Sequence, residues 1–252
     1  MNAEAENEKE LDILEMPLKG IASYWLSLKK IMGNKFNAKA VEDEAERTNE
    51  PFVKHMLGLC SSSFDDETVR RLALAKQEIL LGEARLKFDL MRVALVAVAA
   101  NDNPRKALVD MISRFPAPPV SEAKAVKMAN DMADMVQSGP MADKAVFSVD
   151  HKMKPEQLLV KLLFFIVWAR REGKMALSPF SELTHTPLFA HALTLVADGF
   201  EGGFVDKRMK AQVRELLETA RLKMEMTTEM VIAVRKKTTY EDVSKVAASY
   251  MI

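Results

Sequence analysis

Three side chains that could bind a metal ion lie close together in the sequence: Glu182, His185 and His191. Imidazole and carboxylate groups are common zinc ligands, but a zinc site needs ligands that converge at short helical or hairpin spacing. His185 and His191 lie too far apart for this, and no HExxH or CxxC pattern accompanies them. We therefore expect no metal ion and no cofactor. A deep pocket lined by these three residues would instead favour an enzyme or a ligand-binding helical protein.

Catalytic motifs are missing from the sequence. It contains no GxGxxG, Walker or GxSxG pattern, and no two carboxylates stand out as an acid and base pair. Cys60 is the single cysteine, so no intrachain disulfide can form, which suits a reducing cytoplasm. Its apolar neighbours favour a buried structural thiol over a reactive one. We expect no catalytic residue and no enzyme activity.

Two neighbouring arginines, Arg170 and Arg171, offer a different chemistry in the stretch WARREGKMALSPF. Guanidinium groups at a helix end can project outward and form forked bonds to the carboxylates of a partner. They can also simply offset the negative end of the helix that carries them. Gly173 stands just past the expected helix end, where glycine is favoured. Both interpretations are compatible with the residues, and both can hold together.

The elements that must position these arginines are helices. Glycine is scarce, at nine residues, and apolar residues recur at helical spacing along almost the whole chain. A strong helix begins at Pro155 and ends before Gly173, and the longest helix covers about 205–236. We predict an all-α protein, a helical bundle with a long C-terminal helix. A division into two helical subdomains is left open.

Prolines mark the expected domain boundary. Four of the ten prolines fall between Pro104 and Pro119, and the segment RFPAPPV should be stiff and extended. We therefore divide the chain into five parts. They are a disordered N-terminus (1–10), an N-terminal helical region (11–115), a proline-rich linker (116–120), a second helical domain (121–237) and a short C-terminal helix (238–252).

Three local patterns add smaller expectations. The charged run 39–50 looks like a solvated stretch. Thr238 and Glu241 have capping-box spacing at the start of the last helix. Met128, Met132 and Met135 lie at i, i+4 and i+7, which favours a flexible core stripe over a Met-rich groove for a partner.

Charge and hydropathy limit the partners. Lys+Arg and Asp+Glu are both 36, so no overall field favours nucleic acid or a membrane, and recognition must be local. The basic cluster 234–237 gives only a weak indication of such a contact, because it also suits a helix C-terminus. The longest apolar runs, 93–100 and 162–169, are much shorter than the roughly 20 residues that span a bilayer. We expect a soluble, cytoplasmic protein without a signal peptide.

A longer stretch carries a resemblance to a known family. The segment 155–225 resembles the cytoplasmic loop of flagellar stator proteins of the MotA type, within the MotA/TolQ/ExbB proton channel family. The shared features are an apolar helix ending in ARREG, an apolar position at Leu177, a helix ending in VADG, and a long charged helix. In this sequence they are Ala169 to Gly173, Leu177, Leu195 to Gly199, and 205 onward. We therefore describe the second helical domain as stator-loop-like.

The resemblance implies a rotor-facing surface. It places the family's charged arginine at Arg170, with Arg171 and Glu172 beside it as further candidates for partner binding. It also implies structural roles for Gly173, Leu177, Asp198 and Gly199. The sequence departs from the family in two ways: no membrane helices follow the loop, and Ser178 occupies a position where members often carry a glutamate.

Two functions follow as hypotheses. The first is a cytoplasmic binding module at the flagellar motor, at the inner face of the inner membrane, that contacts the rotor, switch or stator through Arg170, Arg171 and Glu172. The second is a helical scaffold or homo-oligomer without rotor contact, which an exposed Met and Leu patch on 121–137 would favour. Neither involves nucleic acid or a membrane span.

Overall fold

The computed structural model describes residues 11–33, 37–138 and 144–251, and within these ranges it contains eleven α-helices and no strand. The predicted all-α fold is therefore confirmed. The long helix expected near the C-terminus is α10, Gly202–Arg235. A second helix of the same length, α4, covers Asp66–Ala99. The expected disordered N-terminus lies outside the described residues.

The chain forms two compact units, and α4 and α10 each contribute residues to both of them. The first unit comprises residues 1–82 and 216–252, and the second comprises 83–215. The units therefore do not divide at the proline-rich segment 116–120, which lies inside the second unit.

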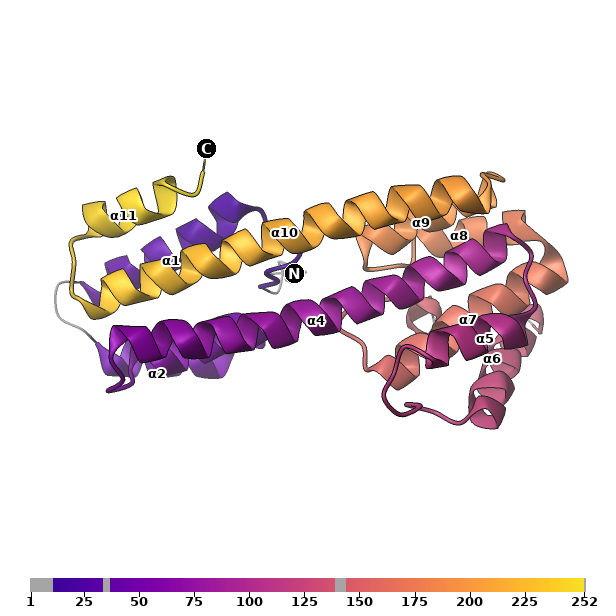
Figure 1. Cartoon of the computed structure of the whole chain (residues 1–252), viewed down its shortest axis with the longest axis horizontal. Helices are drawn as coiled ribbons and strands as arrows, with labels where there is room; N and C mark the ends of the chain where they lie inside the picture. Colours follow the sequence, from indigo (N-terminus) through magenta and orange to yellow (C-terminus); the bar gives the residue numbers. More distant parts are fainter. Residues whose placement is uncertain (1–10, 34–36, 139–143, 252) are drawn as a thin grey trace, which may run out of the picture. The chain divides into compact units, whose positions relative to one another are not determined.

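The packing of α7 explains why the proline-rich segment separates no domains. The helices before and after it, α5 (Pro104–Ile112) and α6 (Glu122–Gln137), both pack on α7 (Pro155–Glu172) (Figure 1). The prolines interrupt the helices, as expected, but the chain on either side shares one core. A proline-rich segment breaks secondary structure locally and says nothing about which helices share a core.

The first unit is built on α1 (Leu18–Met32), α2 (Ala38–Arg47), α3 (Pro51–Cys60) and α11 (Tyr240–Ala248), with parts of α4 and α10. Large side chains without exposed surface form its core: Trp25, Phe52, Met56 and Leu57. Within this unit Arg70 binds Glu229 at 2.8 Å and Arg221 binds Glu78 at 2.7 Å. The order of these pairs along the chain shows that α4 and α10 run antiparallel here.

Most of the charged run 39–50, which the sequence indicated as a solvated stretch, forms α2, and its charged side chains are largely exposed. The Asn37 side chain caps this helix by accepting a hydrogen bond from the Ala40 amide. Val41 is the only buried residue on α2, and the Tyr24 hydroxyl donates to the Glu44 carboxylate at 2.8 Å. A helix held by so few buried side chains gives a weak apolar pattern.

Two further expectations need correction. Thr239, and not Thr238, caps α11, because its hydroxyl accepts from the Asp242 amide at 3.2 Å. The methionine stripe on α6 is not a core stripe: Met132 is buried, but Met128 and Met135 are 39% and 56% exposed. The α6 core face consists of Met132 with small residues that allow close helix packing: Ala125, Ala129 and Ala133.

The second unit is organised around α7, whose residues from Leu158 to Ala169 are all buried except Lys161. The short segment η1 (Lys144–Phe147) precedes α7, and the chain continues after α7 through η2 (Lys174–Leu177) and α8 (Ser178–Ser181) to α9 (Pro187–Ala197). Aromatic rings interlock around α7 with centroids 5.1–5.7 Å apart: Phe147, Phe164, Phe165, Phe180 and Phe189. The apolar run of α7 is thus core.

Membrane spans are not found among the described helices, since none of them combines enough length with enough apolar character to cross a bilayer. Of the two apolar runs that stood out in the sequence, 93–100 lies in α4 up to its last residue, Ala99, and 162–169 lies in α7. Nearly all of their side chains are buried within the second unit.

Candidate functional site

The end of α7 carries the three residues predicted to bind a partner, and the structure gives them different surroundings. Arg171 turns toward α6, where its guanidinium donates to the Asp134 carboxylate and the Asn130 side-chain oxygen, each at 2.6 Å. Glu172 accepts from the Gln137 amide at 3.3 Å. Arg171 and Glu172 therefore fasten α7 to α6.

Arg170 has a weaker hold on its own chain. Its guanidinium is exposed and donates to the backbone carbonyl of Asp102 at 3.3 Å, without a carboxylate partner in the described part of the chain. Lys174 donates in the same region to the carbonyl of Ala99, the last residue of α4. Because carbonyls at a helix C-terminus carry partial negative charge, Lys174 is favourably placed at the end of α4. Lys174 thus contacts the end of α4 and Arg170 the loop that follows it. Arg170 and Arg171 also lie in the last turn of α7, where they can offset the negative end of that helix.

Glycines shape the two helix ends of the motif. Gly173 has a φ of 88°, which favours glycine, and its amide donates to the Ala169 carbonyl at 2.9 Å. Gly199 has the same φ and follows Asp198, which is exposed at the end of α9. Leu177 is fully buried. The four residues to which the resemblance assigned structural roles thus lie at two helix ends and in the core.

A groove lies beside the arginines, between α5, α6 and α7. Its volume is about 760 Å³, and its lining includes Arg105 from α5, Glu122 from α6, and Arg170 and Arg171 from α7. Apolar side chains form its floor: Pro104, Ala123, Val126, Leu163 and Val167. The groove therefore combines three guanidinium groups and one carboxylate with an apolar surface.

Sequence reasoning missed the contribution of α5 and α6 to this groove. Arg105 and Glu122 are far from Arg170 in the sequence, and nothing in their local patterns connects them to it. In the structure Arg105 Nε lies 3.8 Å from a Glu122 carboxylate oxygen, and their side chains are 81% and 50% exposed. An ion pair this long and this exposed neutralises little of either charge.

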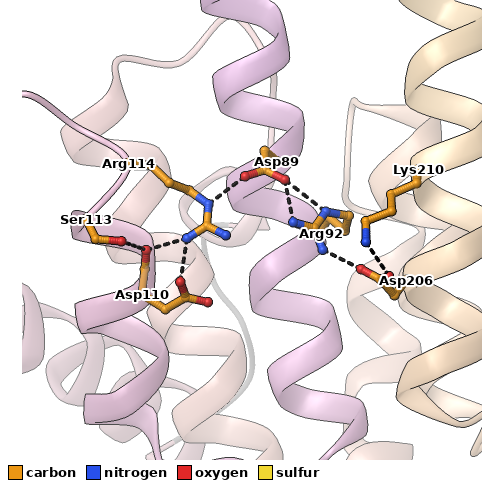
Figure 2. A network of polar contacts seen from close by, with 7 residues as sticks. All are labelled: Asp89, Arg92, Asp110, Ser113, Arg114, Asp206 and Lys210. Carbon is orange, nitrogen blue, oxygen red and sulfur yellow. Dashed lines mark hydrogen bonds and ion pairs between the residues drawn. The ribbon is translucent and has the colours of Figure 1, made fainter.

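A second charged region of the same unit is organised differently. In Figure 2 Asp89 accepts from Arg92 on one side and from Arg114 on the other, with its closest contacts at 2.5 Å. Burial would raise the pKa of Asp89, but the hydrogen bonds from Arg114 and Arg92 outweigh it and hold that pKa below its ordinary value. Asp89 therefore stays ionised between two cations.

The same network extends to both sides. Arg92 also binds Asp206 of α10, which Lys210 contacts at 2.7 Å, and Arg114 binds Asp110 of α5 at 2.6 Å (Figure 2). Arg92 and Arg114 are only 16% and 23% exposed. Such partly buried cations need carboxylate partners, and each has two, so this network holds α4, α5 and α10 together within the second unit.

The three potential metal ligands singled out in the sequence do not form a site. Glu182, His185 and His191 are exposed, and they do not form a group close enough to hold one ion in the part of the chain that was searched. Cys60 is buried, and burial raises the pKa of its thiol to about 11. The thiol is therefore protonated at neutral pH and unreactive.

The basic cluster 234–237 is tied to the first unit. Arg235 donates to the backbone carbonyls of Leu59, Ser62 and Phe64, and Lys236 lies 3.0 Å from the Asp66 carboxylate. Arg235 thus satisfies carbonyls at the end of α3 and just after it, and it is not free to bind a membrane or nucleic acid.

Comparison with protein-family models, curated proteins and solved structures finds no match to this chain.

Proposed function

We propose that the protein is a non-catalytic binding module that engages the carboxylates of a protein partner through the end of α7. The observation that supports this most is the state of Arg170. Its guanidinium is exposed beside a groove and has one carbonyl contact, so most of its donors are available to a partner. Arginine suits this task because its planar group binds carboxylates in a forked geometry.

Arg170 is a better candidate than its neighbours for this contact. Arg171 would have to give up its bonds to Asp134 and Asn130 before it could bind a partner. Glu172 is exposed but carries the opposite charge, and it lies against Gln137. We therefore assign direct contact to Arg170, and we assign to Arg171 and Glu172 the task of holding the end of α7 in place.

The resemblance to the stator loop suggests where such a partner would be found. We propose that the protein contacts the rotor, the switch or the stator of a flagellar motor, at the cytoplasmic face of the inner membrane. Opposite charges across a transient interface mainly speed and orient the encounter, which suits contact with a moving rotor. Ser178 is exposed where the family often carries a glutamate, so the contact would rest on positive charge alone.

Charge reversal tests this proposal. The full chain and its Arg170→Glu, Arg171→Glu and Arg208→Glu variants are titrated with the torque-ring protein of the rotor. Arg208 on α10 is exposed and lies outside the groove, so its variant controls for net charge. We expect Arg170→Glu to weaken binding about tenfold and Arg208→Glu to change it less than about twofold. Equal loss in the two variants, or no binding by the unmodified chain, would contradict the proposal.

A homo-oligomeric scaffold is the second candidate function. The observation in its favour is the outer face of α6, where Met128 and Met135 are 39% and 56% exposed. Methionine side chains adapt well to apolar interfaces. Light scattering across a concentration series decides this point: a dimer or larger species that Met135→Lys dissociates would support the scaffold, and a monomer at every concentration would contradict it.

A further inference from the structure

The groove between α5, α6 and α7 suggests what kind of ligand binds beside Arg170. This inference rests on the proposed function, because that function places binding at this end of α7. The groove has two walls of different origin. Arg170 and Arg171 stand on α7, and Arg105 stands on α5. Side chains that approach from two helices can hold two separate groups of one ligand. A single arginine at a helix end cannot do this.

The charges of the groove are not balanced within it. Three guanidinium groups line it against one carboxylate, that of Glu122. Arg171 is matched by Asp134 nearby, but Arg170 has only a carbonyl, and Arg105 has only the long pair to Glu122. Arg105 and Arg170 are therefore the two cations that a ligand could neutralise, which favours a ligand with at least two negative groups.

The floor of the groove is apolar. Val126 is 38% exposed, whereas Val167 and Leu163 in the same lining are 9% and 0% exposed. An apolar side chain seated over Val126 would remove water from this surface, which favours binding. A free inorganic anion or a sugar phosphate would bring no such side chain, so the floor favours a ligand that is both acidic and apolar.

Nucleic acid fits these observations poorly. Proteins that bind single strands place aromatic rings where bases can stack, and no aromatic residue lines this groove. Glu122 in the lining would also repel a phosphate backbone, which cannot avoid a fixed negative charge. A peptide with separated carboxylates can place an uncharged residue opposite it.

From these features we infer that the groove binds an acidic segment of a protein, with an apolar side chain on the valine floor and flanking carboxylates bound to Arg105 and Arg170. Glu122 acts as an internal competitor, because its carboxylate already lies near Arg105 and must yield to the incoming one. The segment is recognised by this pattern of charge and hydrophobicity and not by a particular sequence.

Binding of a defined probe tests the inference. The probe is a fluorescein-labelled peptide of alternating glutamate and leucine, titrated with the full-length protein at low salt and followed by fluorescence polarisation. Two peptides of equal length serve as controls, one of glutamate and serine and one of lysine and leucine. We expect the glutamate–leucine peptide to bind at least about fivefold more tightly than either control, because only this peptide matches both the arginines and the floor.

Variants then locate the bound peptide. Arg105→Glu should weaken binding about tenfold, Val126→Ser about threefold, and Glu122→Gln should strengthen it about twofold to threefold. Arg208→Glu and Val109→Ser alter exposed residues outside the groove and should change the affinity less than about twofold. Circular dichroism of each variant checks that the helices are intact.

The outcomes separate this inference from the proposed motor function. Equal affinities for the three peptides, or equal loss with Arg105→Glu and Arg208→Glu, would overturn the groove as a peptide site even if the torque-ring protein binds. Selective binding of the glutamate–leucine peptide with no binding to the torque-ring protein would support the groove and reject the motor as its partner.

Discussion

The charge network of Figure 2 and the arginine groove lie in the same unit, but they differ in how completely their arginines are paired with carboxylates. The network contains three carboxylates and three cations: Asp89, Asp110, Asp206, Arg92, Arg114 and Lys210. The groove contains three arginines and one carboxylate. In the network, the carboxylates match the cations in number. In the groove, two cations are left with weak partners, and this surplus of positive charge is what a partner can use.

Burial explains this difference. Arg92 is 16% exposed and would lose much of its hydration without its two carboxylates, whereas Arg105 is 81% exposed and stays hydrated without a close partner. A partly buried charge is tolerated only when it is paired, and an exposed charge carries no such requirement. We therefore expect the fold to depend on the network arginines and to be indifferent to the two weakly paired groove arginines, Arg105 and Arg170.

The largest expected effect comes from breaking the network. Arg92→Leu leaves Asp89 and Asp206 each without one cation in a partly buried site, so we expect it to lower the free energy of unfolding by about 2–3 kcal/mol. Urea denaturation followed by circular dichroism measures this, with Arg208→Leu as the control at less than about 0.5 kcal/mol. Equal midpoints for the two variants would show that the network contributes no more than an exposed arginine.

A smaller effect distinguishes the two arginines of the α7 end. Arg171→Ala removes the bonds to Asp134 and Asn130 and should cost about 1 kcal/mol. Arg170→Ala removes one long bond to a carbonyl and should cost less than about 0.5 kcal/mol. Urea midpoints of the two variants, measured side by side, give the comparison. A larger loss of stability in Arg170→Ala than in Arg171→Ala would indicate that Arg170 stabilises the fold and that Arg171 is the residue available to a partner.

Acid should weaken the network. Arg114 and Arg92 hold the pKa of Asp89 below its ordinary value against the effect of burial, and Lys210 and Arg92 do the same for Asp206. A lowered folded-state pKa gives stability that is fully present above the unfolded-state pKa and is lost as pH falls through the folded-state pKa. We expect the urea midpoint to fall between about pH 5 and pH 2.

Asp89→Asn provides the matched control for this acid effect. The variant lacks the Asp89 carboxylate, so it should be less stable at neutral pH and should lose less stability on acidification. Parallel curves for the variant and the unmodified protein, from neutral pH to acid, would exclude Asp89 as a source of the pH dependence.

The smallest expected effect concerns the carboxylate of the groove. Glu122 forms an exposed pair at 3.8 Å, so Glu122→Gln should change the free energy of unfolding by less than about 0.5 kcal/mol. Urea denaturation at neutral pH measures it beside Asp89→Asn, which should cost more. A large loss of stability in Glu122→Gln would show that the groove carboxylate stabilises the fold, as the carboxylates of the network do.

The sequence predicted well what is encoded locally. As expected, α7 begins at Pro155 and ends just before Gly173, because proline and glycine act on the backbone of their own neighbours. The sequence did not predict α2, since a single buried valine gives almost no apolar pattern. It also placed a domain boundary at 116–120, because a proline-rich composition cannot reveal that the helices on either side share α7.

The candidate site was predicted only in part. Arg170 and Arg171 stood out in the sequence, but their different surroundings depend on Asp102, in the loop between α4 and α5, and on Asp134 of α6, which only the fold brings close to them. Arg105 was not found at all, since it joins the groove only through the packing of α5 on α7. Contacts between distant segments determine which charges are neutralised, and no local pattern contains that information.

The central claim is that Arg170 is available to an acidic protein segment. Calorimetric titration of the full chain with the glutamate–leucine peptide, repeated with Arg170→Glu and Arg208→Glu, tests it most directly. We expect Arg170→Glu to weaken binding at least about fivefold, while its urea midpoint is unchanged and Arg208→Glu stays within about twofold of the unmodified protein. Equal affinity in all three proteins would contradict the claim.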